Sequence, residues 1–171
     1  MMDVLVDKVI EALSYELMRT NSDGASAFYT DKFIEVVTNK SITATTPSLT
    51  IAVVEGDSRP LQFEISSTVS QTAESYSLQI QFIVRAAAEA EAKQYRRIVT
   101  QRIKHAILRT GGKFRALVLG AVDTDEGYRE NVQKYKTSQT RYDNSAIAGE
   151  FIYLSVIELD VETQVSYNEP I

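Results

Sequence analysis

Three closely spaced carboxylates, on Asp123, Asp125 and Glu126, could hold a divalent cation or act as an acid and a base. A calcium loop starting at Asp123 would need glycine at its sixth position and glutamate at its twelfth. Here Gly127 comes one position early, and Lys134 stands at position twelve. An acidic turn in contact with solvent explains the carboxylates with fewer assumptions. We therefore expect no metal site, and acid–base work near 123–126 remains an alternative.

Other reactive side chains are scarce in these 171 residues. The chain has no cysteine, which excludes disulfides, thiolate zinc sites, iron–sulfur clusters and a cysteine nucleophile. Its single histidine, His105, has no accompanying nucleophile or orienting acid in any recognisable pattern. The run Gly111-Gly112-Lys113 follows an expected helix, whereas a phosphate-binding loop precedes one. The sequence thus favours a binding or structural protein with no cofactor over an enzyme.

Charge is distributed unevenly along the chain. The sequence has 18 basic and 23 acidic residues, for a net charge of −5. Residues 92–122 carry eight basic side chains and no acidic one, so subtracting this local +8 leaves −13 on the remainder. Three interpretations compete: a solvated helix face, a subunit interface of complementary charge, or a nucleic-acid contact. The interface interpretation makes Arg96, Arg97 and Arg102 candidate contact residues.

A polar stretch of about 20 residues, from Asp123 to Ser145, is the second unusual feature. Loops of this length are usually functional, so we expect a long polar loop or arm at about 123–145. It could extend as a hairpin arm, form a short helix on a partner, or be an ordinary surface excursion. Tyrosine and arginine are enriched at interfaces. The candidate interface residues in this segment are Tyr128, Arg129, Tyr135, Arg141 and Tyr142.

Hydrophobic periodicity predicts the elements that position these groups. Apolar residues three and four apart predict helices at about 2–19 and 87–110, and residues 28–46 fit neither period. Alternation predicts strands, and turn residues separate them. The expected strands are 49–54, 61–69, 76–84, 116–122 and 147–167, with turns at 56–60 and 71–75. The fold class is α+β, mainly an antiparallel sheet with the N-terminal helix and the long central helix on one face.

The sequence contains no apolar run near the roughly 18 residues of a membrane helix, and its start does not resemble a secretory signal. We therefore expect a single domain, 1–171, that folds in a cytoplasm without membrane contact.

The order of these elements resembles that of bacteriophage tail terminator or tail-completion proteins. The likeness comprises the N-terminal amphipathic helix, a hairpin ending in Tyr76-Ser77-Leu78-Gln79-Ile80-Gln81-Phe82-Ile83-Val84, a long helix ending Ile107-Leu108-Arg109-Thr110-Gly111-Gly112, and a closing strand. It covers most of the chain at the level of element order. The family has no invariant catalytic or binding motif to match residue by residue.

The resemblance implies a small structural virion protein that forms a ring, commonly a hexamer, at the head-proximal end of the tail tube. Its implied partners are copies of itself, the tail tube protein, the neck or connector protein and, in a contractile tail, the sheath. It implies assembly in the host cytoplasm and a final place in the virion tail or neck. DNA would pass through the ring without specific recognition. Another neck, head–tail joining or tail component remains an alternative, as does a small-ligand enzyme using the carboxylates near 123–126.

Overall fold

The computed structural model describes residues 1–18, 34–48, 50–65, 69–147 and 149–168. Six strands in this part of the chain form one sheet, in the order β1-β2-β3-β6-β5-β4. All neighbouring strands are antiparallel except β1 and β2, which are parallel. Along the chain the elements are α1 (Met2–Leu17), β1 (Val36–Thr38), β2 (Thr50–Ile65), β3 (Val69–Ala86), α2 (Glu89–Leu108), α3 (Lys113–Leu119), β4 (Val122–Asp125), β5 (Tyr128–Ile147) and β6 (Glu150–Asn168).

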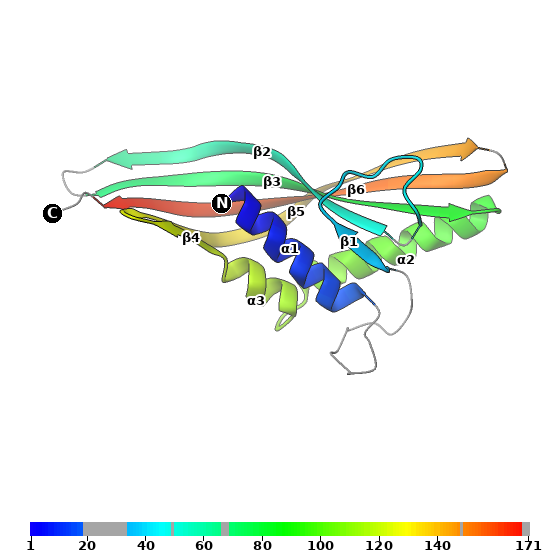
Figure 1. Cartoon of the computed structure of the whole chain (residues 1–171), viewed down its shortest axis with the longest axis horizontal. Coiled ribbons are helices and arrows are strands. Elements are labelled where there is room, and N and C mark those ends of the chain that lie inside the picture. Colours follow the sequence, from blue (N-terminus) through cyan, green and yellow to red (C-terminus); the bar gives the residue numbers. More distant parts are fainter. Residues whose placement is uncertain (19–33, 49, 66–68, 148, 169–171) are drawn as a thin grey trace.

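The helices and the sheet form two layers, which confirms the α+β class. Figure 1 shows α1, α2 and α3 against the same side of a long sheet, and their apolar residues join those of the strands in one core. In α1 the buried positions recur three and four apart, as an amphipathic helix requires. Along the strands these residues alternate with side chains that point to the opposite face of the sheet. Fully buried core side chains include Leu5, Val9, Leu13, Ile80, Phe82, Ile103, Ile107, Ile157 and Leu159.

The opposite face of the sheet has a smaller core. Ile42 packs there against Ala52, Ile83 and Ile152. The backbone N–H of Ile42 donates to Gln81, and the Arg85 guanidinium donates to the carbonyls of Ala44 and Thr46. Two polar side chains of β3 therefore hold the 39–48 segment over the sheet. Of the region left open by the sequence, residues 36–38 form β1, and 28–33 lie outside the described residues.

Two expected turns are wrong: an irregular part of β2 was interpreted as a chain reversal at 56–60, and the polar residues 71–75 continue β3 in regular pairing with β6. Residues 56–60 lie inside β2, and residues 71–75 lie inside β3. The β2–β3 register shifts between Glu55 and Ser58 and again between Pro60 and Gln62. A bulge accommodates an extra residue, and proline is tolerated where no strand needs its missing N–H. Glycine and proline therefore mark an irregular part of β2, beyond the residues that pair with β1.

The apolar run predicted as a strand at 116–122 is helical over most of its length, because α3 covers Lys113–Leu119. Phe114 and Val118, four residues apart, are its buried positions. Short apolar runs do not distinguish a strand from a buried helix, and here the i, i+4 spacing decides.

Of the forms left open for 123–145, the structure shows extended chain: β4 and β5 pair as a hairpin at one end, and the rest of β5 lies within the sheet. Strand β5 pairs with β6 from Tyr128 to Ile147. Its helix-facing positions are largely tyrosine and threonine, and register shifts after Val132 and Thr137 interrupt the alternation. The strand therefore lacked both the apolar residues and the constant period by which strands are predicted.

Candidate assembly surfaces

An arginine of α2 lies over two tyrosine rings of the sheet. The Arg96 guanidinium carbon is 4.4 Å from the ring centre of Tyr142 on β5 and 4.7 Å from that of Tyr153 on β6. Both distances are within the range of a cation–π interaction. The structure thus brings together two sequence-predicted interface residues, Arg96 and Tyr142, and adds Tyr153, which the sequence analysis did not single out.

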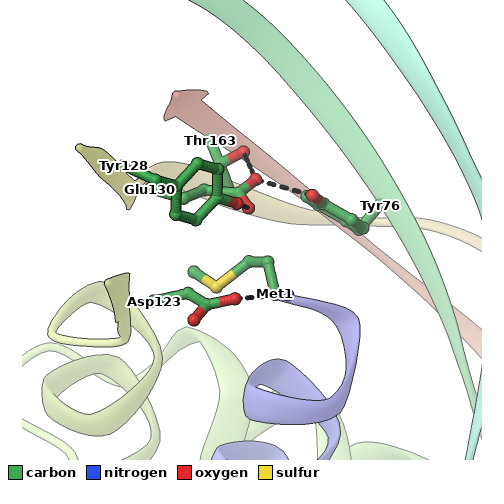
Figure 2. Close-up of polar contacts among 6 residues, drawn as sticks. All are labelled: Met1, Tyr76, Asp123, Tyr128, Glu130 and Thr163. Atoms are coloured by element: carbon green, nitrogen blue, oxygen red, sulfur yellow. Dashed lines mark hydrogen bonds and ion pairs between the residues drawn. The ribbon is translucent and has the colours of Figure 1, made fainter. Parts of the chain in front are cut away.

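The carboxylate of Glu130 on β5 is fully buried and accepts three hydroxyl hydrogen bonds. Tyr76 of β3 and Tyr128 of β5 each donate over 2.6 Å, and Thr163 of β6 donates over 2.5 Å. Figure 2 shows the three hydroxyls converging on this carboxylate from neighbouring strands. Hydrogen bonding of this kind is what allows a carboxylate to be buried. The sequence-predicted Tyr128 therefore has its hydroxyl engaged inside the fold, while its ring packs on Tyr167.

Burial and the Glu130 carboxylate raise the pKa of both Tyr76 and Tyr128 well above the ordinary value for tyrosine. Burial is the larger cause, and the hydrogen bond to Glu130 adds to it because it requires the protonated hydroxyl. The pKa of Glu74, on the same part of β3, is also raised by burial and by the charge of Glu130. The carboxylate of Glu130 thus adds to the effect of burial on the pKa of all three groups.

Tyr135 of β5 also points into the protein. Its hydroxyl donates to the carbonyl of Ile107 over 2.7 Å, and its ring meets Phe114 edge to face with centroids 5.5 Å apart. Beside it lies an open groove of about 280 Å³ between α2, α3 and β5. The groove is lined by Leu108, Arg115, Leu119, Gln133, Lys134 and Tyr135. Leu108 is 57% exposed, so this groove combines accessible apolar surface with the basic side chains of Arg115 and Lys134.

Two acidic residues after α3 accept hydrogen bonds from other groups of the protein. Asp123 accepts an ion-paired hydrogen bond of 2.7 Å from the Met1 ammonium group, and Asp125 accepts from the backbone N–H of Glu126. Figure 2 shows the Met1–Asp123 pair beside the Glu130 cluster. Within the described residues, no group of three or more acidic or histidine side chains is arranged to hold a metal ion.

The remaining candidate arginines lie at different places. Arg97 is exposed on α2 and Arg102 is partly buried there. Arg129 is exposed on β5 and donates to Asn131, and Arg141 pairs with Glu158 at 3.1 Å on the sheet face away from the helices. The eight sequence-predicted residues therefore do not form one patch, because α2 and the two faces of β5 separate them. Their role in assembly stays a prediction.

Glu16, near the end of α1, is a buried charged residue that the sequence analysis missed. One carboxylate oxygen accepts from the Arg109 guanidinium and from the backbone N–H of Lys113, each over 2.9 Å. It thereby ties α1 to the end of α2 and the start of α3. A glutamate within the apolar stripe formed by Leu13 and Leu17 was the available signal, because charge at such a position needs a buried partner.

Comparisons with known proteins show little likeness. No family model matches the chain, and no curated protein matches it. Among solved structures, a chain of the "Virion of native gene transfer agent (GTA) particle" is similar at 15% identity and a TM-score of 0.30. The match covers 74% of this chain and 78% of that one. In the described part of the chain, no helix is long and apolar enough to cross a membrane.

Proposed function

We propose that this chain is a structural subunit of a phage-like virion, and that it forms a ring that caps the head-proximal end of a tail tube and joins it to the neck. The observation that carries the proposal is the arrangement of its elements. The chain runs through an N-terminal helix, a long hairpin, a long helix and a closing long strand. The strands form one sheet, and all described helices pack on one side of it. This is the element order on which the resemblance to tail terminators rests.

The polar groups support an assembly role over a catalytic one. Glu130 is held by three hydroxyls, Glu16 by an arginine and a backbone N–H, and Asp123 by an ammonium group. These carboxylates therefore join elements of the fold to one another.

A closed ring repeats the same contact between every pair of neighbouring subunits. Once several copies are joined, each further contact is effectively intramolecular, so weak individual interfaces sum to a stable closed assembly. The exposed arginines Arg97, Arg129 and Arg141 are candidates for such contacts. Because exposed charges are screened by salt, contacts that depend on them weaken as ionic strength rises.

The test is the mass of the protein in solution, measured by light scattering over a wide concentration range at low and high salt, alone and with tail tube protein. We expect a discrete ring-sized species, near six copies of the 19.1-kDa chain, alone or on addition of the tube protein. A chain that stays monomeric under every one of these conditions would overturn the proposal. A ring that binds neck proteins but not the tube would instead support another neck component.

A further inference from the structure

The short outermost strands β1 and β4 each cover only one end of the longer strand beside them, β2 and β5 respectively. On one side, β1 pairs with β2 only at Thr50–Ala52. On the other side, β4 pairs with β5 only at Tyr128–Asn131. Among the described residues, no strand pairs with the outer side of β2 from Val53 onward or with that of β5 from Val132 onward. The sheet therefore has two long open edges, which are sites where another chain can add.

The open stretches lie at the same height in the sheet. Strand pairing aligns Val53 with Thr140, through the middle residues of β3 and β6. The same pairings align Pro60 with Val132 through Glu74 of β3 and Thr163 of β6. The strands β2 and β5 also run in opposite directions, because three antiparallel steps separate them. A neighbouring copy in the same orientation can therefore bring its β2 alongside β5 without a shift along the strands.

The two edges carry opposite charge. Glu55, Asp57 and Arg59 are exposed on β2, so this stretch carries a net charge of −1. On the other edge, Lys134 and Lys136 are exposed on β5. We call Glu55, Asp57 and Leu61 the acidic edge. Lys134, Lys136 and the exposed Arg115 of α3 are the basic edge.

Lys134 pairs with Glu162 of β6 at 3.1 Å. Its side chain is nevertheless 72% exposed, so this pair is open to solvent and leaves the ammonium group accessible to a further carboxylate.

Apolar surface accompanies the charge at the same height. Leu61 of the acidic edge is 45% exposed. It follows Pro60, which is level with Val132, next to the groove lined by Leu108, Leu119 and Tyr135. A copy placed alongside β5 would thus bring its exposed Leu61 towards the open groove that contains the exposed Leu108. Burying such surface together supplies the non-directional part of an interface.

We propose that the acidic edge of one copy packs against the basic edge of the next, head to tail, around the ring. This inference rests on the proposed self-assembly and specifies its interface. Pro60 and the two register shifts prevent an uninterrupted ladder along β2, so side chains make most of the contact. Like edges repel each other, which disfavours a two-fold dimer. The level edges require no shift along the strands between successive copies. A head-to-tail contact of this kind closes into a ring when the rotation from one copy to the next divides the full circle.

The experiment uses two double variants of the full chain. E55K/D57K makes both edges basic, and K134E/K136E makes both edges acidic. Each should assemble at least tenfold more weakly than the unaltered chain at low salt, because like charges meet at every contact. An equimolar mixture should recover assembly, because the two proteins then alternate and every contact is complementary. K8E/K93E is the matched control: both lysines are exposed and pair locally with Glu11 and Glu89, and its charge change equals that of K134E/K136E.

Light scattering of each variant and of the mixture, with circular dichroism to verify folding, distinguishes the outcomes. Recovery in the mixture alone supports the edge contact. Two variants that assemble like the unaltered chain would overturn the edge contact but leave the proposed ring intact. Loss of assembly without recovery in the mixture would also overturn it, because a head-to-tail contact must be complemented. If the unaltered chain never assembles, even with tube protein, the proposed function itself fails.

Discussion

Tyr76 of β3 donates a hydrogen bond to Glu130 of β5 across the strand that separates them, with 2.6 Å between the two oxygens. The intervening strand β6 contributes Thr163 to the same carboxylate. A single buried charge therefore bonds three consecutive strands of the sheet through their side chains. In the middle of the sheet, the paired positions that face the helices are mostly apolar. At this end they include tyrosine, threonine and glutamate, whose side chains are joined by hydrogen bonds.

Removing one hydroxyl from this cluster should destabilise the fold. Tyr76→Phe leaves the buried carboxylate with one donor fewer, and we expect a loss of about 1.5–3 kcal/mol in the free energy of unfolding, as for hydrogen bonds to charged groups. Urea denaturation followed by circular dichroism measures it. Tyr142→Phe is the matched control, because that tyrosine is exposed. Equal stability of the two variants would show that the Tyr76 hydroxyl contributes nothing.

The same cluster predicts a loss of stability at alkaline pH. The pKa of Tyr76 and of Tyr128 is raised in the folded state, so the unfolded chain releases these protons first, from about pH 10. Their stabilising contribution is therefore complete below pH 10 and declines above it, by up to about 1.4 kcal/mol per pH unit for each tyrosine. Unfolding free energies measured from pH 8 to 11.5 should fall less steeply for Tyr76→Phe. Parallel curves for variant and parent would contradict this linkage.

The buried charge of Glu16 should be costly to remove. Glu16→Ala leaves the Arg109 guanidinium and the Lys113 N–H without this acceptor, and we expect a loss of about 3–5 kcal/mol, as for broken buried ion pairs. Glu16→Gln retains an acceptor oxygen and should lose less. Thermal and urea unfolding of the two variants measure the difference. A loss below about 1 kcal/mol for Glu16→Ala would indicate that solvent replaces the carboxylate.

Gly56 is required by the close approach of two strands. A Cβ atom at this position would lie 2.4 Å from the carbonyl oxygen of Ser77, inside the register shift of β2. Gly56→Ala should therefore cost about 1–3 kcal/mol, as for overpacking against backbone. Ser58→Ala, at an exposed neighbouring position, should stay within about 0.5 kcal/mol. If both substitutions are neutral in urea denaturation, the strands separate here at no cost.

The tyrosines of β5 show how far sequence periodicity predicts this fold. Tyr128, Tyr135 and Tyr142 are seven apart, an odd spacing that would put neighbouring members on opposite faces of a regular strand. Each register shift in β5 adds one residue, so the three lie opposite Tyr167, Val161 and Ser155 of β6, which are six apart. All three therefore share one face. Regular elements such as α1, α2 and β6 were predicted because their period is constant, and β5 was missed because its period is not.

Buried charges are the other part that the sequence did not predict. Glu130 lies in a polar stretch, and its three donors come from three strands, so no local pattern marks it. The sequence does show the clustering of tyrosine and arginine, and the structure brings Arg96 to Tyr142. Such a residue can stabilise the fold or contact another subunit. Its tertiary contacts decide between these roles, and sequence spacing does not reveal those contacts.

Arg96 and the adjacent Arg97 allow these two roles to be separated by experiment. Arg96 lies over the rings of Tyr142 and Tyr153, whereas Arg97 is exposed. Arg96→Ala should reduce the free energy of unfolding, and a double-mutant cycle with Tyr142→Ala should give a coupling of about 0.5–2 kcal/mol. Arg97→Glu should leave the free energy of unfolding unchanged.

If α2 takes part in assembly, Arg97→Glu should weaken oligomer formation at low salt and have less effect at high salt, because that charge is open to screening. Urea denaturation and light scattering of the same two proteins provide both measurements. If Arg97→Glu changes neither quantity, the α2 surface is a solvated helix face and takes no part in the ring contacts.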